Sequence, residues 1–276
     1  MPDRHAAFVG TIPPIYDRYL GPLFFQPYAD DLAARVVPTP DMRVLEIACG
    51  TGLVTRRLLE RLGGHGSVLA TDLNEPMLAY AHGQVPGAPG LAWRQADAMA
   101  LPVPDRSFDA VVCGFGLLLF SDKPAAIREA FRVLRPGGAY LFNAWGPFAD
   151  NPAPRIAHET VATFFPEDPP QFYTIPFGCR DPAPICGWLA DAGFTAVAWT
   201  AVTRTGTSPS AAEAAIGLIE GNPIGPAIVA RRADAVAEVE RAVAARLVAS
   251  SAIIPSGRRC APWCSRRGGR GGRRVC

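Results

Sequence analysis

The sequence has no apolar run long enough to cross a membrane. Its longest run, Val111 to Phe120, is far shorter than the roughly 20 residues that a membrane-spanning helix needs. The first residues also lack the basic and then apolar segments of a signal peptide. We therefore expect a cytoplasmic protein without a membrane span.

Cysteines are too scattered for a disulfide framework. There are seven, an odd number, and Cys49 and Cys113 lie in apolar surroundings, where a thiol packs as a small hydrophobic group. Cys260 and Cys264 have the spacing of half a metal site, but no second pair of ligands has a suitable spacing. The sequence therefore predicts neither disulfides nor a metal centre.

Neither acidic nor basic residues predominate, since the formal net charge of the 276 residues is +2. Seven of the 27 basic residues lie in 257–276, which hold no acid, so residues 1–256 carry 20 basic and 25 acidic side chains. The body of the protein is thus mildly acidic and its basic character belongs to the end of the chain. With 49% hydrophobic residues, the chain can form one large domain, or one domain with a cap.

Strand-like and helix-like segments alternate between Met42 and Trp145. We expect strands at 42–48, 67–72, 91–97, 108–115 and 139–145, and helices at 53–62, 75–82 and 123–134. This alternation predicts an α/β fold with a doubly wound, mostly parallel sheet of the seven-stranded type and helices on both faces.

The rest of the chain divides around this sheet. Residues 1–40 are predicted to form a helical lid, and 41–205 an α/β domain with a proline-rich cap inserted at about 147–184. Residues 206–256 are predicted to be C-terminal helices, with one helical stretch from Ala211 to Leu247, and 257–276 a basic, irregular tail.

A glycine loop follows the first strand in VLEIACGTG, from Val44 to Gly52. Gly50 and Gly52 allow close approach to a ligand, and the next helix begins with unpaired N–H groups. Asp72 ends the second strand, 20 residues after Gly52, which is the spacing at which an acid reaches ribose hydroxyls. A nucleoside-containing cofactor is therefore expected at this edge of the sheet.

The loop departs from the dinucleotide pattern. Thr55 stands where the third glycine of that pattern would be, and Glu46 lies in the strand just before the loop. A carboxylate there opposes a pyrophosphate but suits a ligand with an amino group and a sulfonium. The loop therefore favours S-adenosylmethionine over NAD.

Four segments together, VLEIACGTG, ATDLNEPML, QADAMALPVPDRSFDAVV and EAFRVLRPGG, resemble the class I S-adenosylmethionine-dependent methyltransferases of the ubiquinone and menaquinone C-methyltransferase type. The resemblance covers about residues 12–205. It implies a cofactor site formed by Tyr16, Glu46, Ala48, Cys49, Gly50, Thr51, Gly52, Asp72, Leu73, Met77, Asp97, Ala98, Cys113 and Phe115. Ala48 departs from the glycine that is common at its position.

Aromatic residues after the strands and in the lid and cap predict the acceptor pocket. They are Tyr19, Trp145, Phe172, Tyr173 and Phe177. Such a lining predicts transfer of a methyl group to a small apolar or aromatic molecule, such as a phenol or quinol, at oxygen or carbon. His158 in the cap is a candidate base if the acceptor needs one, although no catalytic residue is strictly required.

Two other interpretations of the sequence involve nucleic acids. DPPQFY, from Asp168 to Tyr173, has the letters of a motif of DNA amino-methyltransferases but does not follow the fourth strand, so a nucleic-acid acceptor is not expected. The alternative function is that of a non-catalytic protein that binds RNA or a partner through its arginine-rich tail. The sequence leaves open whether the chain forms a homodimer.

The tail itself lacks a strand pattern. Proteins of the family that this chain resembles end with a strand that lies beside the fifth strand of the sheet. Reading the codons of residues 259–265 two bases over gives a mostly apolar, strand-like run whichever third bases are used, provided that Ser265 has a TCN codon. We therefore hypothesise that a frameshift replaced the final strand, which is then missing from the sheet.

Overall fold

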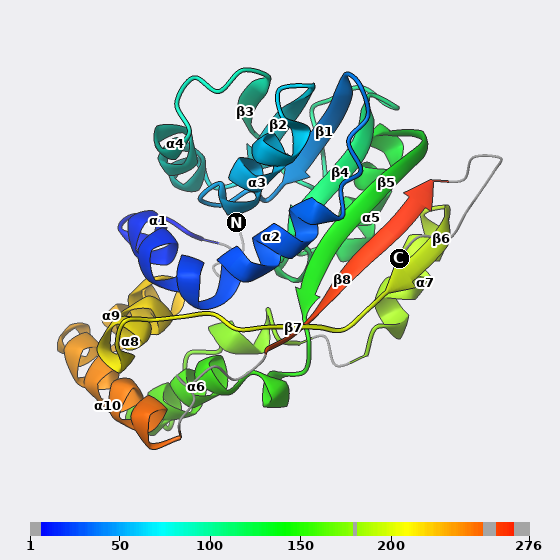
Figure 1. Ribbon diagram of the computed structural model, residues 1–276. Coiled ribbons are helices and arrows are strands. Elements are labelled where there is room, and N and C mark those ends of the chain that lie inside the picture. The colour runs from blue at the N-terminus through cyan, green and yellow to red at the C-terminus, as the bar shows by residue number, and fades with distance from the viewer. Residues whose placement is uncertain (1–6, 179–180, 251–257, 268–276) are drawn as a thin grey trace.

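The computed structural model describes residues 7–178 and 181–250 and the backbone of 258–267. One sheet forms its centre, with the strand order β3-β2-β1-β4-β5-β8-β6 and with β7 beside β8 (Figure 1). The strands are β1 (Met42–Ile47), β2 (Gly66–Asp72), β3 (Leu91–Gln95), β4 (Phe108–Gly114), β5 (Leu134–Trp145), β6 (Phe194–Trp199), β7 (Val202–Arg204) and β8 (Arg258–Arg267).

Strands β1 to β5 pair in parallel, which confirms the predicted doubly wound α/β fold. Helices cover both faces, and each face buries its own apolar cluster. The helices are α1 (Ile12–Ile15), α2 (Gln26–Ala34), α3 (Leu53–Leu62), α4 (Glu75–Gln84), α5 (Lys123–Val133), α6 (Pro152–Phe164), α7 (Ala183–Asp191), α8 (Ala211–Glu220), α9 (Ile224–Arg231) and α10 (Val236–Ala249).

The lid and the last helices gather where the parallel strands end. Figure 1 shows α1, α6 and α8 to α10 at that end of the sheet, whereas α2 runs onto the face that α3 also covers. Between α1 and α2 the chain continues as η2 (Tyr16–Phe25), a π-helical stretch that contains Pro22. A third apolar cluster lies beneath this layer and joins the lid to the cap and to the last helices. Residues 1–6 of the predicted lid lie outside the described residues.

The predicted C-terminal helices are present, but an unbroken helix from Ala211 to Leu247 would be wrong, because the structure divides this stretch into α8, α9 and α10. The first break is at Asn222 and Pro223. The Asn222 side chain accepts a hydrogen bond from the backbone N–H of Ile224 (3.1 Å) and so competes with the helical bonding pattern. The break lets α8 and α10 pack against each other.

The expectation of a missing final strand is also wrong for residues 258–267. They form β8, which pairs antiparallel with β5 on one side and with β6 and β7 on the other. Proline has no backbone N–H to donate to a neighbouring strand. Pro262 lies between Trp263, at which the pairing of β8 with β6 ends, and Cys260, at which its pairing with β7 begins, so neither β6 nor β7 needs an N–H from it. The remainder of the predicted tail, 257 and 268–276, lies outside the described residues.

Candidate functional site

A cavity of about 440 Å³ lies at the ends of the parallel strands, between the sheet and the lid. It is lined by most of the residues that the sequence pointed to. From the predicted cofactor site these are Tyr16, Ala48, Gly50, Asp72, Leu73, Met77, Asp97, Ala98 and Phe115, and from the predicted acceptor pocket Trp145, Phe172, Tyr173 and Phe177.

The glycine loop and Asp72 hold each other in place. Asp72 accepts hydrogen bonds from the backbone N–H groups of Gly50 and Asn74, both at 2.8 Å. Burial raises the pKa of Asp72, while these hydrogen bonds oppose the rise. Gly50 has a φ of +56°, and no atom lies within 4 Å of where a β-carbon would stand. The bare loop thus leaves room for a ligand beside a fixed carboxyl group.

A smaller chamber of about 40 Å³ adjoins the cavity, and Tyr16, Ala48, Gly50 and Phe115 line both hollows. Glu46, Cys49 and Thr51, which the sequence also assigned to the cofactor site, line only this chamber. Burial raises the pKa of the Cys49 thiol, which disfavours a reactive thiolate.

The carboxyl group of Glu46 is 1% exposed. The hydroxyl Oγ1 of Thr55 donates a hydrogen bond to Oε2 of Glu46 at 2.6 Å. Burial raises the pKa of Glu46 to about 8, so this carboxyl group is largely neutral at pH 7 when no cation is bound beside it.

Four predicted site residues line neither hollow. Gly52 begins α3, and a β-carbon there would lie 3.3 Å from that of Ala81, so its small size serves packing. The side chain of Cys113 is buried within the cluster on the face of the sheet that α5 covers. Tyr19 packs against α8 at Gly217.

His158, the candidate base, is the fourth of these residues. It lies on α6 with its ring centre 5.6 Å from that of Phe148, and burial lowers its pKa. The structure therefore does not bring this histidine to the cavity.

Aromatic rings form the far end of the cavity. Phe115 stacks on Trp145 with 4.1 Å between ring centroids, and Phe177 lies 5.3 Å from Trp145. The lid adds Phe25, whose ring is stacked on Tyr16 at 4.7 Å and meets Phe115 edge-on. This end of the cavity therefore suits a flat apolar molecule.

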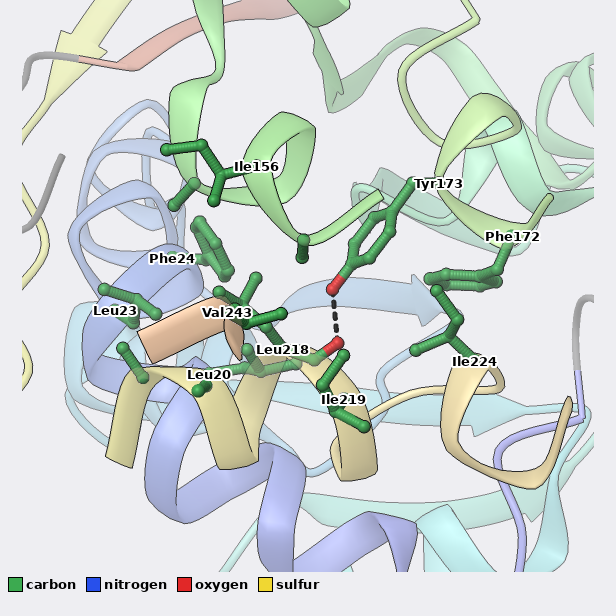
Figure 2. Packing of buried hydrophobic residues seen from close by; sticks show 14 of the residues in the cluster. Leu20, Leu23, Phe24, Ile156, Phe172, Tyr173, Leu218, Ile219, Ile224 and Val243 are labelled. Atoms are coloured by element: carbon green, nitrogen blue, oxygen red, sulfur yellow. Dashed lines mark hydrogen bonds between the residues drawn. The ribbon is translucent and has the colours of Figure 1, made fainter. Parts of the chain in front are cut away.

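A polar group is fixed within this apolar wall. The hydroxyl of Tyr173 donates a hydrogen bond to the carbonyl oxygen of Leu218 in α8, as Figure 2 shows among the surrounding aliphatic side chains. Asn222 donates from Nδ2 to that carbonyl oxygen (2.9 Å) and to the hydroxyl of Tyr173 (3.2 Å). The cap is thereby joined to the C-terminal helices beside the cavity.

Several residues that line the hollows were missed from the sequence. They include Phe8, Leu20, Phe24, Phe25, Asn74, Met99, Phe120, Ser121, Asn143 and Asn222. The lid residues gave only an aromatic-rich composition as a signal. Asn143 had a clearer signal, because it is an amide within the largely apolar run of residues 139–145.

Comparison with known proteins identifies the family. A methyltransferase domain model matches residues 44–138. The ubiquinone/menaquinone biosynthesis C-methyltransferase UbiE of Xanthomonas oryzae is 43% identical over 102 residues, which are 36% of this chain and 40% of the relative. UbiE of Yersinia pestis is 33% identical over 179 residues, 58% of this chain and 69% of the relative. The chain belongs to the class I S-adenosylmethionine-dependent methyltransferases.

This methyltransferase also has the fold of a solved structure, the [4+2]-cyclase SpnF, with a TM-score of 0.61, 20% identity and 93% of both chains covered. At that identity the likeness shows the fold alone. The methyltransferase spans 40% of the length of its Xanthomonas relative. Its family therefore identifies S-adenosylmethionine as the cofactor but does not settle the acceptor.

The lining of the two hollows is chemically suited to that cofactor. Leu73, Met77 and Ala98 offer apolar surface for adenine, and Asp72 offers a carboxylate for ribose. Within the described residues of this methyltransferase, no cluster of side chains is suited to hold a metal ion. In the same part of the chain, no helix combines the length and the apolar character needed to cross a membrane.

Proposed function

We propose that this chain transfers the methyl group of S-adenosylmethionine to a small aromatic or apolar acceptor of the phenol or quinol class. The observation that carries the proposal is that one cavity is lined both by the loops of the predicted cofactor site and by aromatic rings of the lid and the cap. Asp72 and Asp97, the only acidic residues among its described lining, belong to the loops of the predicted cofactor site, whereas aromatic rings line the other end. The names of the quinone-biosynthesis relatives support the same class of acceptor.

The roles that we propose for the residues at the cofactor end follow from their positions in the lining of the cavity. The carboxylate of Asp72 binds the ribose hydroxyls, the bare backbone at Gly50 lies against the methionine part, and Met77 packs on the adenine face. When bound, the cofactor supplies an electrophilic methyl group on a positively charged sulfur.

At the acceptor end, the chain acts by holding a flat molecule between rings and by excluding water. No acidic residue or histidine is among the described residues that line this end, so no side chain there is suited to act as a strong base. Methyl transfer is an in-line displacement that disperses charge, so positioning and a dry site supply most of the catalysis. A phenol or quinol acceptor gives its proton to water before it is enclosed in the dry site.

Binding calorimetry tests the cofactor half of the proposal. Asp72→Ala is expected to weaken S-adenosylmethionine binding by about 1–3 kcal/mol, because it removes charge-assisted hydrogen bonds to ribose. Glu75→Ala serves as the control, since it removes a nearby exposed carboxylate that does not line the cavity. NAD is expected not to bind. Binding of NAD as tight as that of S-adenosylmethionine would contradict the assignment.

A screen of phenols and quinols with cofactor labelled in the methyl group tests the acceptor half. Label is expected in at least one acceptor of this class and not in aliphatic amines of similar size. Tight cofactor binding without transfer to any phenol or quinol would rule out the proposed acceptor class while leaving the cofactor site intact.

A further inference from the structure

The small chamber holds a polar group with no partner. Asn143 lies near the end of β5, is 1% exposed, and its amide oxygen Oδ1 forms no hydrogen bond to any described residue. Thr51 lines the same chamber, and its Oγ1 is likewise buried without a partner. Because burying an unpaired polar atom costs free energy, two such atoms in one hollow indicate a missing occupant.

The sheet explains how Asn143 reaches this chamber. Asn143 is paired with Gly114 of β4, and Val112, two residues before Gly114, is paired with Glu46 of β1. Since side chains alternate along a strand, Glu46, Gly114 and Asn143 share one face of the sheet. Gly114 has no side chain, which leaves space between the other two, and a β-carbon there would lie 3.0 Å from Val54.

The chamber is chemically suited to a small cation that donates hydrogen bonds. Its volume of about 40 Å³ accommodates one group of the size of a water molecule or an ammonium. Its oxygen-bearing side chains include a carboxyl group, an amide and a hydroxyl, and none of the described residues that line it is a lysine, arginine or histidine. A ligand carboxylate would face Glu46, and the basic group that acts on Glu46, Arg56, lies outside this lining, whereas Asp72 adds a second acid nearby.

The occupant is part of a ligand in the main cavity, because the two hollows share the glycine loop as a wall. S-adenosylmethionine carries an α-ammonium group at the end of its amino-acid part. We propose that Asn143 is a cofactor-binding residue whose amide oxygen accepts a hydrogen bond from that ammonium, beside the carboxylate of Glu46. This role depends on the cofactor and not on the identity of the acceptor.

The assignment predicts selectivity by the amino-acid part of the ligand. S-adenosylhomocysteine retains the ammonium, whereas 5′-methylthioadenosine has the same nucleoside and a thioether but no amino acid. Loss of Asn143 should therefore weaken binding of the first molecule and leave the second unchanged. A purely structural asparagine would affect both molecules alike.

Calorimetry on the full chain with these two molecules tests the proposal. Asn143→Leu, which keeps the size and removes the oxygen, is expected to weaken S-adenosylhomocysteine binding at least about tenfold, since hydrogen bonds to charged groups are worth about 1.5–3 kcal/mol. Binding of methylthioadenosine should change less than twofold. Asn143→Asp, which keeps an oxygen acceptor, should bind S-adenosylhomocysteine no more than about threefold weaker.

Two results would overturn the assignment. Equal weakening for both molecules would make Asn143 a packing residue, and unchanged binding of both would mean that the chamber holds only water. If Asn143→Leu does not fold, Asn143→Ser carries the same comparison, because its shorter hydroxyl cannot reach the position of the amide oxygen.

Discussion

Glu46 illustrates which residue properties depend on distant parts of the chain. Its position before the glycine loop was enough to favour a positively charged cofactor. Its raised pKa was not visible in the sequence, because the desolvation that causes it is a property of the folded environment and not of the neighbouring letters. The same holds for Asn143. Its amide oxygen is buried without a hydrogen-bond partner because of how three neighbouring strands are arranged, and the sequence alone does not show this.

Binding of S-adenosylmethionine is expected to release a proton from Glu46. The pKa of about 8 leaves the carboxyl group mostly neutral at pH 7, and a bound ammonium favours the carboxylate. Affinity should therefore rise with pH between about 6 and 7.5, where an α-amino group with a pKa near 7.7–8.0 stays mostly protonated. Calorimetry in buffers with different ionisation enthalpies measures the released proton.

Two variants control this measurement. Glu46→Gln should abolish the proton release, whereas Glu240→Gln, which removes another carboxyl group with a raised pKa far from the cavity, should preserve it. An affinity that does not change with pH in the wild type would contradict the prediction.

Ala48 and Gly116 form a second residue-scale pair. Ala48 has a φ of +54°, and a β-carbon on Gly116 would lie 2.5 Å from its own β-carbon. Gly116→Ala is therefore expected to lower the free energy of unfolding by about 1–3 kcal/mol through overpacking. In the Ala48→Gly background this contact is removed and the closest remaining approach is 3.1 Å, to the sulfur of Cys113, so the same change should cost at least about 1 kcal/mol less.

Urea unfolding of the two single variants and the double variant measures this coupling. Ala48→Gly alone should be close to neutral, because relief of the left-handed strain is offset by greater freedom of the unfolded chain. Effects that add to within about 0.3 kcal/mol would show that the two positions do not interact.

Elements whose boundaries depend on nearby residues were predictable. Helix α5 begins at Lys123 as expected, and Asp122 just before it accepts a hydrogen bond from the N–H of Ala125 at 2.8 Å. The break between α8 and α9 was not predicted, because Asn222 is held there by Tyr173, which is 49 residues away in the chain. The start of α5 is therefore set by residues next to it in the sequence, whereas the break between α8 and α9 is set by a tertiary contact.

The packing of α8 against α10 is expected to depend on pH. Glu240 of α10 has its pKa raised to about 7 by burial and by a side-chain hydrogen bond with Glu220 of α8. Because the pKa of Glu240 is higher in the folded than in the unfolded protein, this group contributes to the free energy of unfolding below pH 4.5, the ordinary pKa of a glutamate. That contribution is lost as the pH rises through about 7. Glu240→Gln should remove that loss.

Thermal unfolding between pH 4 and 8 measures this effect. The Tm of Glu240→Gln should approach that of the wild type at pH 4 and exceed it by about 2 °C at pH 8, a modest gain because the group is partly exposed. Glu238→Gln, on the same helix, should show no gain that grows with pH. A constant Tm difference between wild type and Glu240→Gln would contradict the prediction.

At the scale of the whole molecule, the parallel part of the sheet followed from the alternation of apolar segments. The last strand did not, because residues 258–267 have no strand pattern of their own and β8 is specified by the two edges that it joins. The sequence predicted that aromatic residues line the cavity, but not all of the residues that do so. The lid and the last helices meet over it through contacts between segments that are far apart in the chain.

The backbone of β8 contradicts the missing strand that the frameshift hypothesis predicted, and resequencing the gene tests the reading frame itself. We expect a shifted frame near codon 259. A variant that carries the alternative translation of this region should then have a higher Tm, because apolar strand residues would occupy the central position of β8. An intact frame would contradict the hypothesis.

The place of β8 has a consequence for synthesis on the ribosome. β8 is later in the chain than β5 and β6, yet it lies between them, and in the described sheet β6 pairs with β8 alone. Until residues 258–267 emerge, the nascent chain exposes one long unpaired edge at β5 and a strand with no neighbour at β6. Such edges recruit other chains. The interval before residues 258–267 emerge is thus the period when this protein is most exposed to association with other chains, and slow codons before position 258 would lengthen it.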